Sequence, residues 1–391
     1  MTYYVGLDIA KFKHDCFIMD HNGEVIRESF SFRNDRSGFL QLLDVLSSLD
    51  KSSTIKIGLE ATGHYATNLK IFLEENHFSY MEFHPLLIKR FSAATTLRRT
   101  KTDKVDARLI AVYLSTVEYK PYPNKSYHIY SLKLLTRNRD KLVRERSLQL
   151  VRMTNMLDLI FPEFKSFFAG KLSSATALYI LENYTVPSRI AKMNIESYKK
   201  MASKLRRTIP YSRFTELKQL ARDTVGNEDP LLVFQLESYL EIFRELDSRI
   251  DLFDQRIESE FNQIHTHILS IPGIGIISAA SIFAEIGNIA RFSDPGKLLA
   301  FAGLEPSTIQ SGEAEHTGKM VKHGSSHLRY VLMNVAEYSL IHNPVLYDYY
   351  LKKRGEEKEH RVALSHVAKK IVRIIYHLET HDTDFDSSKL R

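Results

Sequence analysis

The first 115 residues switch between strand-like and helix-like segments, and this order constrains the fold more than any other feature of the sequence. Residues 3–9, 13–20 and 24–32 are rich in β-branched and aromatic side chains, which predicts three consecutive strands. A helical pattern follows, and two further strands are predicted at 54–59 and 78–83, each followed by helical patterns. This order is typical of a layered α/β domain with a mixed sheet.

The middle of the chain is predicted to be helical. One long helical pattern covers residues 127–159 and a second covers residues 231–269. Apolar residues recur every seven positions in the second pattern, which is typical of a coiled coil. The repeat consists of Leu236, Phe243, Ile250, Ile257 and Ile264. Because the interleaved apolar positions slip at Glu260, a long helix packed within its own chain stays open as the alternative.

Glycine-rich stretches mark the last third of the chain. Ile271-Pro272-Gly273-Ile274-Gly275, followed by small residues at 278–284, predicts a helix-hairpin-helix-like element. Glycines at such a turn let backbone N–H groups approach a phosphate at a helix N-terminus, although a plain tight junction is the alternative. Helical patterns at 328–341 and 362–378 predict a mainly helical C-terminal domain. The predicted parts are 1–120, an α/β domain; 121–268, a helical and coiled-coil region; 269–380, the C-terminal domain; and 381–391, a flexible tail.

The charge of the chain favours a polyanionic partner. There are 54 Lys and Arg residues against 47 Asp and Glu residues, which gives a net charge of +7 and a pI near 9.1. The single cysteine, Cys16, excludes an internal disulfide and fits a reducing compartment. The longest uncharged apolar run, 268–284, is interrupted by Pro272, Gly273 and Gly275, so we expect no membrane association.

Four acidic residues occupy positions that predict a metal site. Asp8 lies in the middle of the first apolar strand, where an unpaired carboxylate would be costly, and Glu60 follows the apolar strand 54–59. Asp103 and Asp106 are three residues apart at the start of a predicted helix, so both lie on one helical face. Converging carboxylates offer the oxygen ligands with which two Mg²⁺ ions would clamp a phosphodiester during an in-line displacement. The alternatives are ordinary acids at a helix N-terminus and a surface strand end.

Basic residues and two glycines are predicted to contact a nucleic-acid backbone. They precede or begin the helix predicted near residue 103, lie within the helix predicted at 127–159, and recur in the C-terminal domain. A solvated helix face is the alternative for the second group. The predicted contacts are Arg98, Arg99, Lys101, Lys104, Arg137, Arg139, Lys141, Arg144, Arg146, Gly273, Gly275, Lys319, Lys322 and Arg329.

A serine next to a glycine, Ser311-Gly312, lies in a predicted flexible loop near Lys319 and Lys322. An accessible hydroxyl in a positive field is suited to attack a phosphate. From spacing alone, however, Ser-Gly in a loop is most often only a turn. Ser307 and Ser325 offer competing hydroxyl groups.

Motifs at both ends of the chain resemble one known family. Gly-Leu-Asp-Ile-Ala-Lys at 6–11, Leu-Glu-Ala-Thr-Gly-His-Tyr at 59–65 and Lys-Thr-Asp-Lys-Val-Asp-Ala at 101–107 resemble the acidic motifs of the DEDD transposases of the IS110 family. The run from 271–275 through Gly303-Leu304-Glu305-Pro306 and Ser311-Gly312 to Leu328-Arg329 resembles the C-terminal transposase domain of the same family. After Ser-Gly the family often has glycine or basic residues, whereas this chain has Glu313-Ala314-Glu315.

The resemblance implies a fold, a site and partners. It implies a RuvC-like ribonuclease H fold for the N-terminal domain, with Asp8, Glu60, Asp103 and Asp106 as the catalytic, metal-binding tetrad and Ser311 as the nucleophile. It also implies donor and target DNA, a structured guide RNA, and a homo-oligomer, a dimer or tetramer, in which the acidic domain of one subunit completes the serine site of another. A bacterial or archaeal protein of the cytoplasm, associated with the nucleoid, is expected.

The sequence therefore predicts a DNA transposase or site-specific recombinase that cleaves and rejoins strands. One alternative is a structure-selective nuclease of the Holliday-junction resolvase type, which would use the same acids with water as the nucleophile. The other is a non-catalytic nucleic-acid-binding protein whose carboxylates are structural.

Overall fold

The structure is a computed structural model that describes residues 1–50, 52–60, 63–83, 85–95, 103–119, 121, 126–206, 208–311 and 314–389. Side chains are described for the same residues except 63, 95, 103–104, 126–128, 307–311 and 314–319. The chain forms two compact units, one of Met1–Ser131 with Gly287–Ser293 and one of Leu132–Ile286 with Asp294–Arg391.

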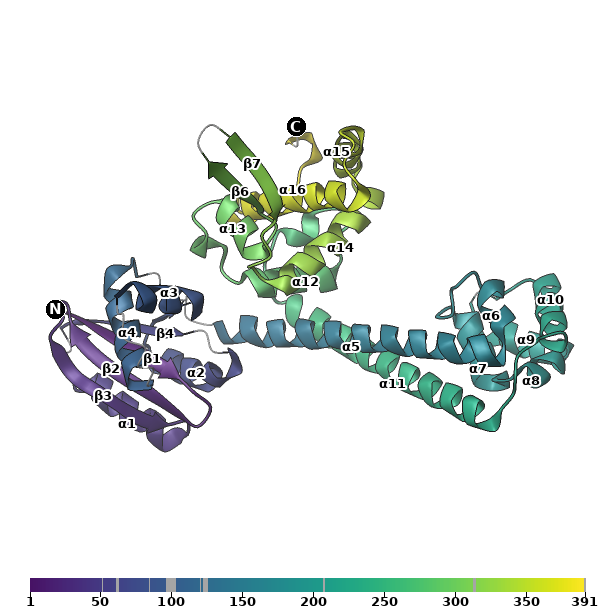
Figure 1. The fold of residues 1–391 in the computed structure, drawn as a ribbon, viewed down its shortest axis with the longest axis horizontal. Helices are drawn as coiled ribbons and strands as arrows, with labels where there is room; N and C mark the ends of the chain where they lie inside the picture. The colour runs from purple at the N-terminus through teal and green to yellow at the C-terminus, as the bar shows by residue number, and fades with distance from the viewer. Residues whose placement is uncertain are drawn as a thin grey trace. The chain divides into compact units, whose positions relative to one another are not determined.

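The first unit is built on a five-stranded mixed sheet with strand order β3-β2-β1-β4-β5 (Figure 1). On one side of β1, the strands β2 and β3 continue the sheet in antiparallel pairs. On the other side, β4 and β5 run parallel to β1. The prediction of a mixed sheet is confirmed. The strands are β1 (Thr2–Ile9), β2 (Lys13–Asp20), β3 (Val25–Arg33), β4 (Thr54–Glu60) and β5 (Tyr80–Phe83).

Helices cover both faces of this sheet. On one face, α1 (Arg36–Ser47) and α2 (Thr67–Glu75) bury leucine and phenylalanine side chains against Val5 and Leu7 of β1. On the opposite face, α3 (Pro85–Thr95) and α4 (Asp103–Thr116) pack through Ile88, Ala107 and Ile110. The even-numbered residues of β1 therefore face α4, because successive side chains of a strand point to opposite faces.

Two long helices, α5 (Ser126–Ile160) and α11 (Pro230–Phe261), lie side by side (Figure 1). The second unit contains α11 and the part of α5 from Leu132 onward. They run in opposite directions, because Arg139 pairs with Asp254 while Arg146 pairs with Asp247. Of the five predicted heptad residues, Leu236, Phe243, Ile250 and Ile257 are buried within the chain, whereas Ile264 is half-buried and lies beyond the end of α11. Of the two possibilities that the sequence left open, the structure shows packing within the chain. α11 ends at Phe261, just past Glu260, where the predicted repeat slips.

Five short helices pack against one end of this helical pair. Phe164, Phe214 and Leu217 join Met153 of α5 and Phe243 of α11 in one hydrophobic core. The helices are α6 (Pro162–Phe167), α7 (Ala175–Tyr184), α8 (Pro187–Ala191), α9 (Ile195–Lys204) and α10 (Tyr211–Arg222).

The C-terminal part of the second unit is mainly helical, as predicted, with one β-hairpin. β6 (Pro306–Ser311) and β7 (Ala314–Met320) pair in the segment that the sequence predicts as a loop. A short 3₁₀ turn, Ile268–Ser270, precedes the glycine-rich turn, so a full helix follows that turn but does not lead into it. The helices are α12 (Ile276–Ile286), α13 (Pro295–Ala302), α14 (Ser326–His342), α15 (Pro344–Gly355) and α16 (His360–His381).

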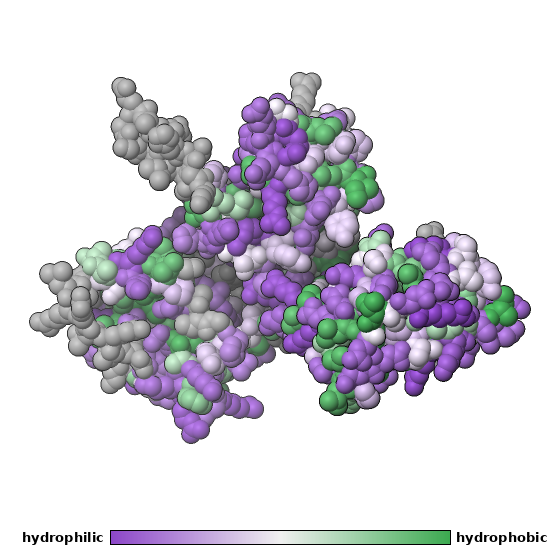
Figure 2. Space-filling view, turned by 45° about the vertical axis from the view of Figure 1, so that its right-hand side comes forward, coloured by the Kyte–Doolittle hydropathy of each residue, from purple (hydrophilic) through white to green (hydrophobic). Residues whose placement is uncertain are grey.

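The visible face of the molecule is predominantly hydrophilic, with hydrophobic side chains scattered over it in small groups (Figure 2). Within the part of the chain that the structure describes, no helix combines the length and the apolar composition that a membrane crossing requires.

Candidate functional site

Two glycines allow α4 to lie directly on the centre of the sheet. Gly6 of β1 and Gly58 of β4 are register partners. A Cβ atom at Gly6 would collide with the carbonyl oxygen of Ala107 and lie 2.6 Å from the amide nitrogen of Ala111. One at Gly58 would lie 2.8 Å from the ring of Phe83. Only hydrogen at Gly6 permits the backbone of α4 to approach this closely, and Gly58 leaves room for the side chains of Phe83, Leu114 and Ile110.

Asp8 and Glu60 lie on the sheet face that α4 covers. Each follows one of these glycines by two residues, and the period of a strand is two, so each side chain leaves the sheet on the side of α4. Leu7 and Leu59 are register partners, which sets the next residues, Asp8 and Glu60, beside each other at the carboxyl ends of β1 and β4. Both side chains are half-buried.

The direction of α4 brings its acidic first turn to the same end of the sheet. Tyr119, just beyond the helix, donates a hydrogen bond of 2.9 Å from its hydroxyl to the carbonyl oxygen of Ser79, which directly precedes β5. The helix therefore runs against the parallel strands, and its N-terminus lies at their carboxyl ends. Asp106, half-buried, immediately precedes Ala107, which contacts Gly6. The backbone of Asp103 begins the helix, and its side chain lies outside the described residues.

A fifth carboxylate, not predicted from the sequence, belongs to this face. Asp15 of β2 is the register partner of Asp8 and is only 1% exposed. Its Oδ1 accepts a hydrogen bond of 2.5 Å from the hydroxyl of Ser31, and its Oδ2 lies 3.8 Å from Nζ of Lys13. Pairing the predicted strands 3–9 and 13–20 as a hairpin would have revealed Asp15, because directly opposite residues in an antiparallel pair share a face.

This donor set fits a hard divalent cation. Asp8, Asp15, Glu60 and Asp106 offer carboxylate oxygens only, from neighbouring strands and the helix over them, and Mg²⁺ prefers such oxygen ligands. Carboxylates on one face of a sheet repel one another, and a bound cation lowers that repulsion. The face thus has the chemistry of a metal site.

The predicted nucleophile lies on the β-hairpin of the second unit. Ser311 is the last residue of β6 and the register partner of Ala314, which places its backbone at the turn of the hairpin. The side chains of Ser311 and Lys319 lie outside the described residues. Lys322 follows the hairpin and is exposed, and Arg329 lies on α14 with its guanidinium 3.5 Å from the carbonyl oxygen of Ala302.

Comparison with known proteins identifies the family. A family model described as a transposase, of the DEDD type of IS110, matches residues 5–162, and one described as transposase IS116/IS110/IS902 family matches residues 265–351. Both constellations described above fall inside these matches. The chain belongs to the IS110 family of transposases.

Relatives of this IS110-family chain match it over nearly its whole length. A mini-circle putative transposase for IS117 from Streptomyces coelicolor is 24% identical, covering 100% of this chain and 96% of that protein. A pilin gene-inverting protein from Moraxella bovis is 23% identical, covering 98% of this chain and 97% of that protein. As a member of a transposase family, the chain is an enzyme that cleaves and rejoins DNA, and the DEDD motif implies a divalent metal requirement.

Most of the basic residues of α5 that are predicted to contact nucleic acid interact with other residues of this IS110-family chain. Arg139 forms two hydrogen bonds to Asp254, of 2.7 and 3.0 Å, and Arg146 pairs with Asp247. Arg144 lies with its guanidinium carbon 5.2 Å from the centre of the ring of Tyr330. Lys141 is exposed. Nucleic-acid binding by these residues stays a prediction, and the ion pairs give two of them a structural role as well.

Arg137 of the same helix contributes to a buried ion cluster around Glu285 of α12. Glu285 is 3% exposed and accepts hydrogen bonds of 2.5 and 3.0 Å from Arg137 and of 2.9 Å from the hydroxyl of Ser325, with Nζ of Lys133 at 3.3 Å. Burial raises the pKa of Glu285, but the hydrogen bond from Arg137 and the charge of Lys133 outweigh it and hold the pKa below its ordinary value. The cluster joins α5, α12 and α14.

The two glycines of the predicted phosphate-binding turn differ in their surroundings. Gly273 has φ of 95° and lies so close to Ser339 of α14 that a Cβ atom would be 2.8 Å from the Cα of that serine. Gly275 has open space where a Cβ atom would lie, directly before α12. Helix packing therefore accounts for Gly273, whereas Gly275 is placed where a ligand can approach.

The remaining predicted contacts lie outside what the structure describes. Arg98, Arg99 and Lys101 are outside the described residues, as is the side chain of Lys104.

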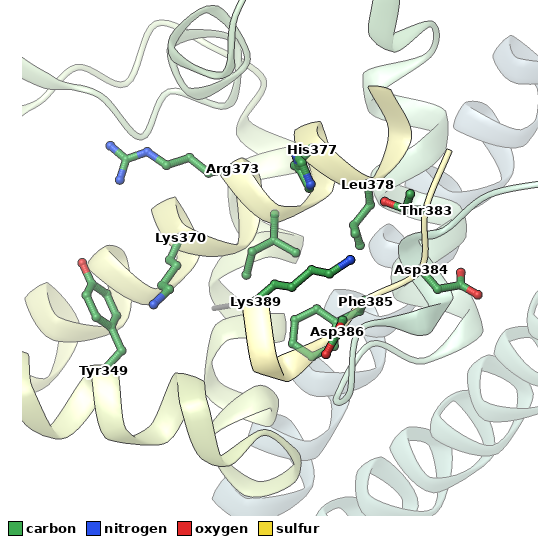
Figure 3. Close-up of a pocket in the computed structure, with 11 residues that line it drawn as sticks. Tyr349, Lys370, Arg373, His377, Leu378, Thr383, Asp384, Phe385, Asp386 and Lys389 are labelled. Carbon is green, nitrogen blue, oxygen red and sulfur yellow. The ribbon is translucent and has the colours of Figure 1, made fainter. Parts of the chain in front are cut away.

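A cavity of about 500 Å³ lies elsewhere in the second unit, between α15, α16 and the segment after α16 (Figure 3). Lys370, Arg373 and His377 of α16 line it together with Tyr349 and Lys389. Of the residues that the structure describes, those lining this cavity include none of the predicted site residues.

Proposed function

We propose that this protein cleaves and rejoins DNA strands with a Mg²⁺-binding acidic tetrad, Asp8, Glu60, Asp103 and Asp106, and with Ser311 as the nucleophile. The observation that carries the proposal is the arrangement of acids on one face of the sheet. Asp8 and Glu60 lie at the carboxyl ends of neighbouring strands, where the helix that bears Asp103 and Asp106 begins. The five-stranded mixed sheet also supports the RuvC-like ribonuclease H fold.

The carboxylates would hold the metal and orient the scissile phosphate. Bound Mg²⁺, two ions in this proposal, would supply positive charge that stabilises the phosphate as negative charge accumulates on it. Asp15, buried and hydrogen-bonded to Ser31, would add a negative charge beside Asp8 and so strengthen the binding of the metal.

Ser311 would make the covalent link. Its hydroxyl oxygen attacks the phosphorus, a serine–phosphate ester forms, and the bond from phosphorus to a deoxyribose oxygen breaks. The serine proton passes to a base, and the released strand end takes up a proton. Attack of a different strand end on the ester reverses these changes and joins new partners, so the ester conserves the energy of the cleaved bond.

The acidic tetrad and Ser311 belong to different compact units of the chain, so the proposed site requires that these units come together. We propose a homo-oligomer, dimer or tetramer, in which the acidic domain of one subunit completes the serine site of another. The α11 seam is buried in its own chain, so that oligomer would use other surfaces.

Nucleic acids would bind through the basic residues not used in ion pairs. We propose Lys141, Arg144 and Lys322, all exposed, together with the backbone at Gly275, as contacts to the phosphates of donor DNA, target DNA or a structured guide RNA. Base pairing by that RNA would select the DNA sequence, while the protein would read the shape of the duplex.

A covalent-adduct experiment tests this function. The full-length protein would be incubated with Mg²⁺, labelled DNA and candidate guide RNA transcribed from the sequence flanking the gene, then digested and mapped by mass spectrometry. We expect a phosphonucleotide on Ser311, none in Ser311→Ala, and an unchanged adduct in the matched variant Ser307→Ala.

The same experiment separates the alternatives. If Ser311→Ala cleaves strands as fast as the natural protein, water is the nucleophile and the Holliday-junction-resolvase mechanism replaces this one. The non-catalytic alternative is disfavoured, because the chain belongs to a family of transposases.

A further inference from the structure

The connection between α11 and α12 is hydrogen-bonded to the end of α16 and to the segment that follows it. The amide of His267 and the hydroxyl of Thr266 donate hydrogen bonds of 2.8 and 2.7 Å to the carboxylate of Glu379. The amide of Phe385 donates a hydrogen bond of 2.8 Å to the hydroxyl of Ser270. These contacts bring two stretches of chain together that are more than 100 residues apart.

Two histidines and an aspartate converge where these stretches meet. Nε2 of His267 lies 2.8 Å from Oδ1 of Asp382, and Nε2 of His265 lies 3.5 Å from the same oxygen. One ligand atom from each of the three residues falls within 4.8 Å of the others. The imidazole rings of the two histidines lie 5.0 Å apart, nearly perpendicular to each other.

The second nitrogen of His267 is held by another carboxylate. Nδ1 lies 2.8 Å from Oδ1 of Asp384, and the side chain of His267 is only 12% exposed. A carboxylate on Nδ1 fixes the ring and favours the tautomer protonated there, so that Nε2, which faces Asp382, can exchange its contact with that carboxylate for a bond to a metal. Figure 3 shows Asp384 at one edge of the cavity, on the opposite side from Tyr349 and Lys370.

We propose that His265, His267 and Asp382 form a transition-metal site, with Zn²⁺ as the ion that fits best and Asp384 as the residue that orients His267. Two imidazoles and a carboxylate suit Zn²⁺, whereas Mg²⁺ and Ca²⁺ prefer oxygen ligands alone. Four-coordinate Zn²⁺ with bonds of about 2.0 Å separates its ligand atoms by roughly 3.3 Å. The distances from Asp382 to the two histidines bracket this value.

The backbone supports the site. Asp382 ends α16 in the left-handed conformation, with φ of 53°, and its amide bonds to the carbonyl oxygen of Leu378. The side chain of His265 is 81% exposed, so it can rotate to close the last distance without disturbing a core. A bound ion would cross-link the connection between α11 and α12 to the end of α16, in addition to the hydrogen bonds that already join them.

A metal titration of the full-length protein tests the proposal. Co²⁺, a spectroscopic substitute for Zn²⁺, would be added to the Asp8→Asn protein so that the sheet carboxylates are weakened as competitors. We expect visible absorption bands of a nitrogen- and oxygen-coordinated ion, saturating at one Co²⁺ per chain and removed by one equivalent of Zn²⁺. Thermal unfolding should shift to higher temperature with Zn²⁺ alone.

Variants assign the ligands. His265→Ala and His267→Ala should each weaken Co²⁺ binding at least tenfold, and Asp384→Asn should weaken it by roughly tenfold to a hundredfold, as expected for a residue that orients a ligand. His360→Ala, on α16, and Asp386→Asn, in the same segment as Asp384, should bind like the parent protein. His265→Ala retains every buried contact, so its circular dichroism spectrum should match that of the parent.

Three results would overturn the site. The first is the absence of the absorption bands at millimolar Co²⁺. The second is equal Co²⁺ affinity in His265→Ala and the parent protein. The third is that restoring Asp8 doubles the number of bound Co²⁺ ions while the histidine variants do not change that number. Each leaves the proposed strand-exchange chemistry untouched, because neither histidine belongs to it.

Discussion

The sheet face under α4 and the surroundings of Glu285 in the helical unit place carboxylates in different environments. On the sheet face, Asp8, Asp15, Glu60 and Asp106 come from neighbouring strands and one helix turn. In the helical unit, Glu285 is surrounded by Lys133, Arg137 and the hydroxyl of Ser325. Two basic side chains surround Glu285, whereas four carboxylates line the sheet face, where Lys13 lies beside Asp15. Buried ion pairs such as those of Glu285 stabilise the packing of helices, and several carboxylates at the end of a sheet favour the binding of a cation.

The largest effect that this comparison predicts is the loss of activity in Asp8→Asn. The substitution keeps the size of the side chain but removes a charged metal ligand, so strand exchange should fall on the order of 10³-fold or more. The free energy of unfolding should change by only about 1 kcal/mol, measured by urea denaturation. Unaltered exchange would refute the metal-binding tetrad.

Glu285→Gln should show the opposite pattern. Removing one partner of a buried ion pair leaves the charges of Lys133 and Arg137 uncompensated, so the free energy of unfolding should fall by about 3 kcal/mol. Mg²⁺ affinity should stay the same, measured by calorimetry on the folded protein. A glutamine variant as stable as the parent protein would mean that the cluster does not hold the helices together.

Asp15→Asn sharpens the description of the sheet face. The amide can still accept the hydrogen bond from Ser31, but the negative charge beside Asp8 is lost, so Mg²⁺ or Mn²⁺ affinity should fall by about tenfold to a hundredfold. The matched control is Asp20→Asn, a buried aspartate of the same strand whose Oδ1 accepts from the amides of Asn22 and Glu24. The control should lose stability but bind metal normally, and equal metal affinity in both variants would show that Asp15 is only structural.

The smallest effect concerns acid stability. The pKa of Glu285 lies below its ordinary value of 4.5, so its contribution to folding is present above that value and is lost as the pH falls through the lowered pKa. The difference in unfolding free energy between the natural protein and Glu285→Gln should therefore be largest near pH 7 and shrink below about pH 4. Urea denaturation at pH 7 and pH 3.5 measures it, and a constant difference would contradict the assigned charge.

The sequence predicts the parts of the fold that depend on local patterns. The strand predicted at 54–59 corresponds to β4, and the apolar helical patterns at 328–341 and 362–378 lie within α14 and α16. Asp8 and Glu60 could be singled out because each carboxylate interrupts or ends an apolar strand. Their side-by-side position follows once β1 and β4 are known to be parallel neighbours.

What the sequence could not give depends on partners far along the chain. The ion pair between Arg137 and Glu285 joins residues 148 positions apart, so a basic helix cannot be told from a helix that pairs its own charges. The segment of β6 and β7 is polar and has glycines near it, a composition that predicts a loop. Only the pairing of its two halves in the structure shows that it is a hairpin. The significance of Asp15 comes from its register with Asp8, which depends on how two strands pair and not on any local pattern.

Because Gly6 has no Cβ atom, it sets how closely the backbone of α4 approaches the sheet. One added methyl group at Gly6 would lift the helix and draw its acidic first turn away from the strand ends, although no charged atom had changed. The geometry of the proposed site therefore depends on a residue that has no functional group of its own. A substitution at Gly6 is expected to inactivate the protein although every proposed catalytic group is retained.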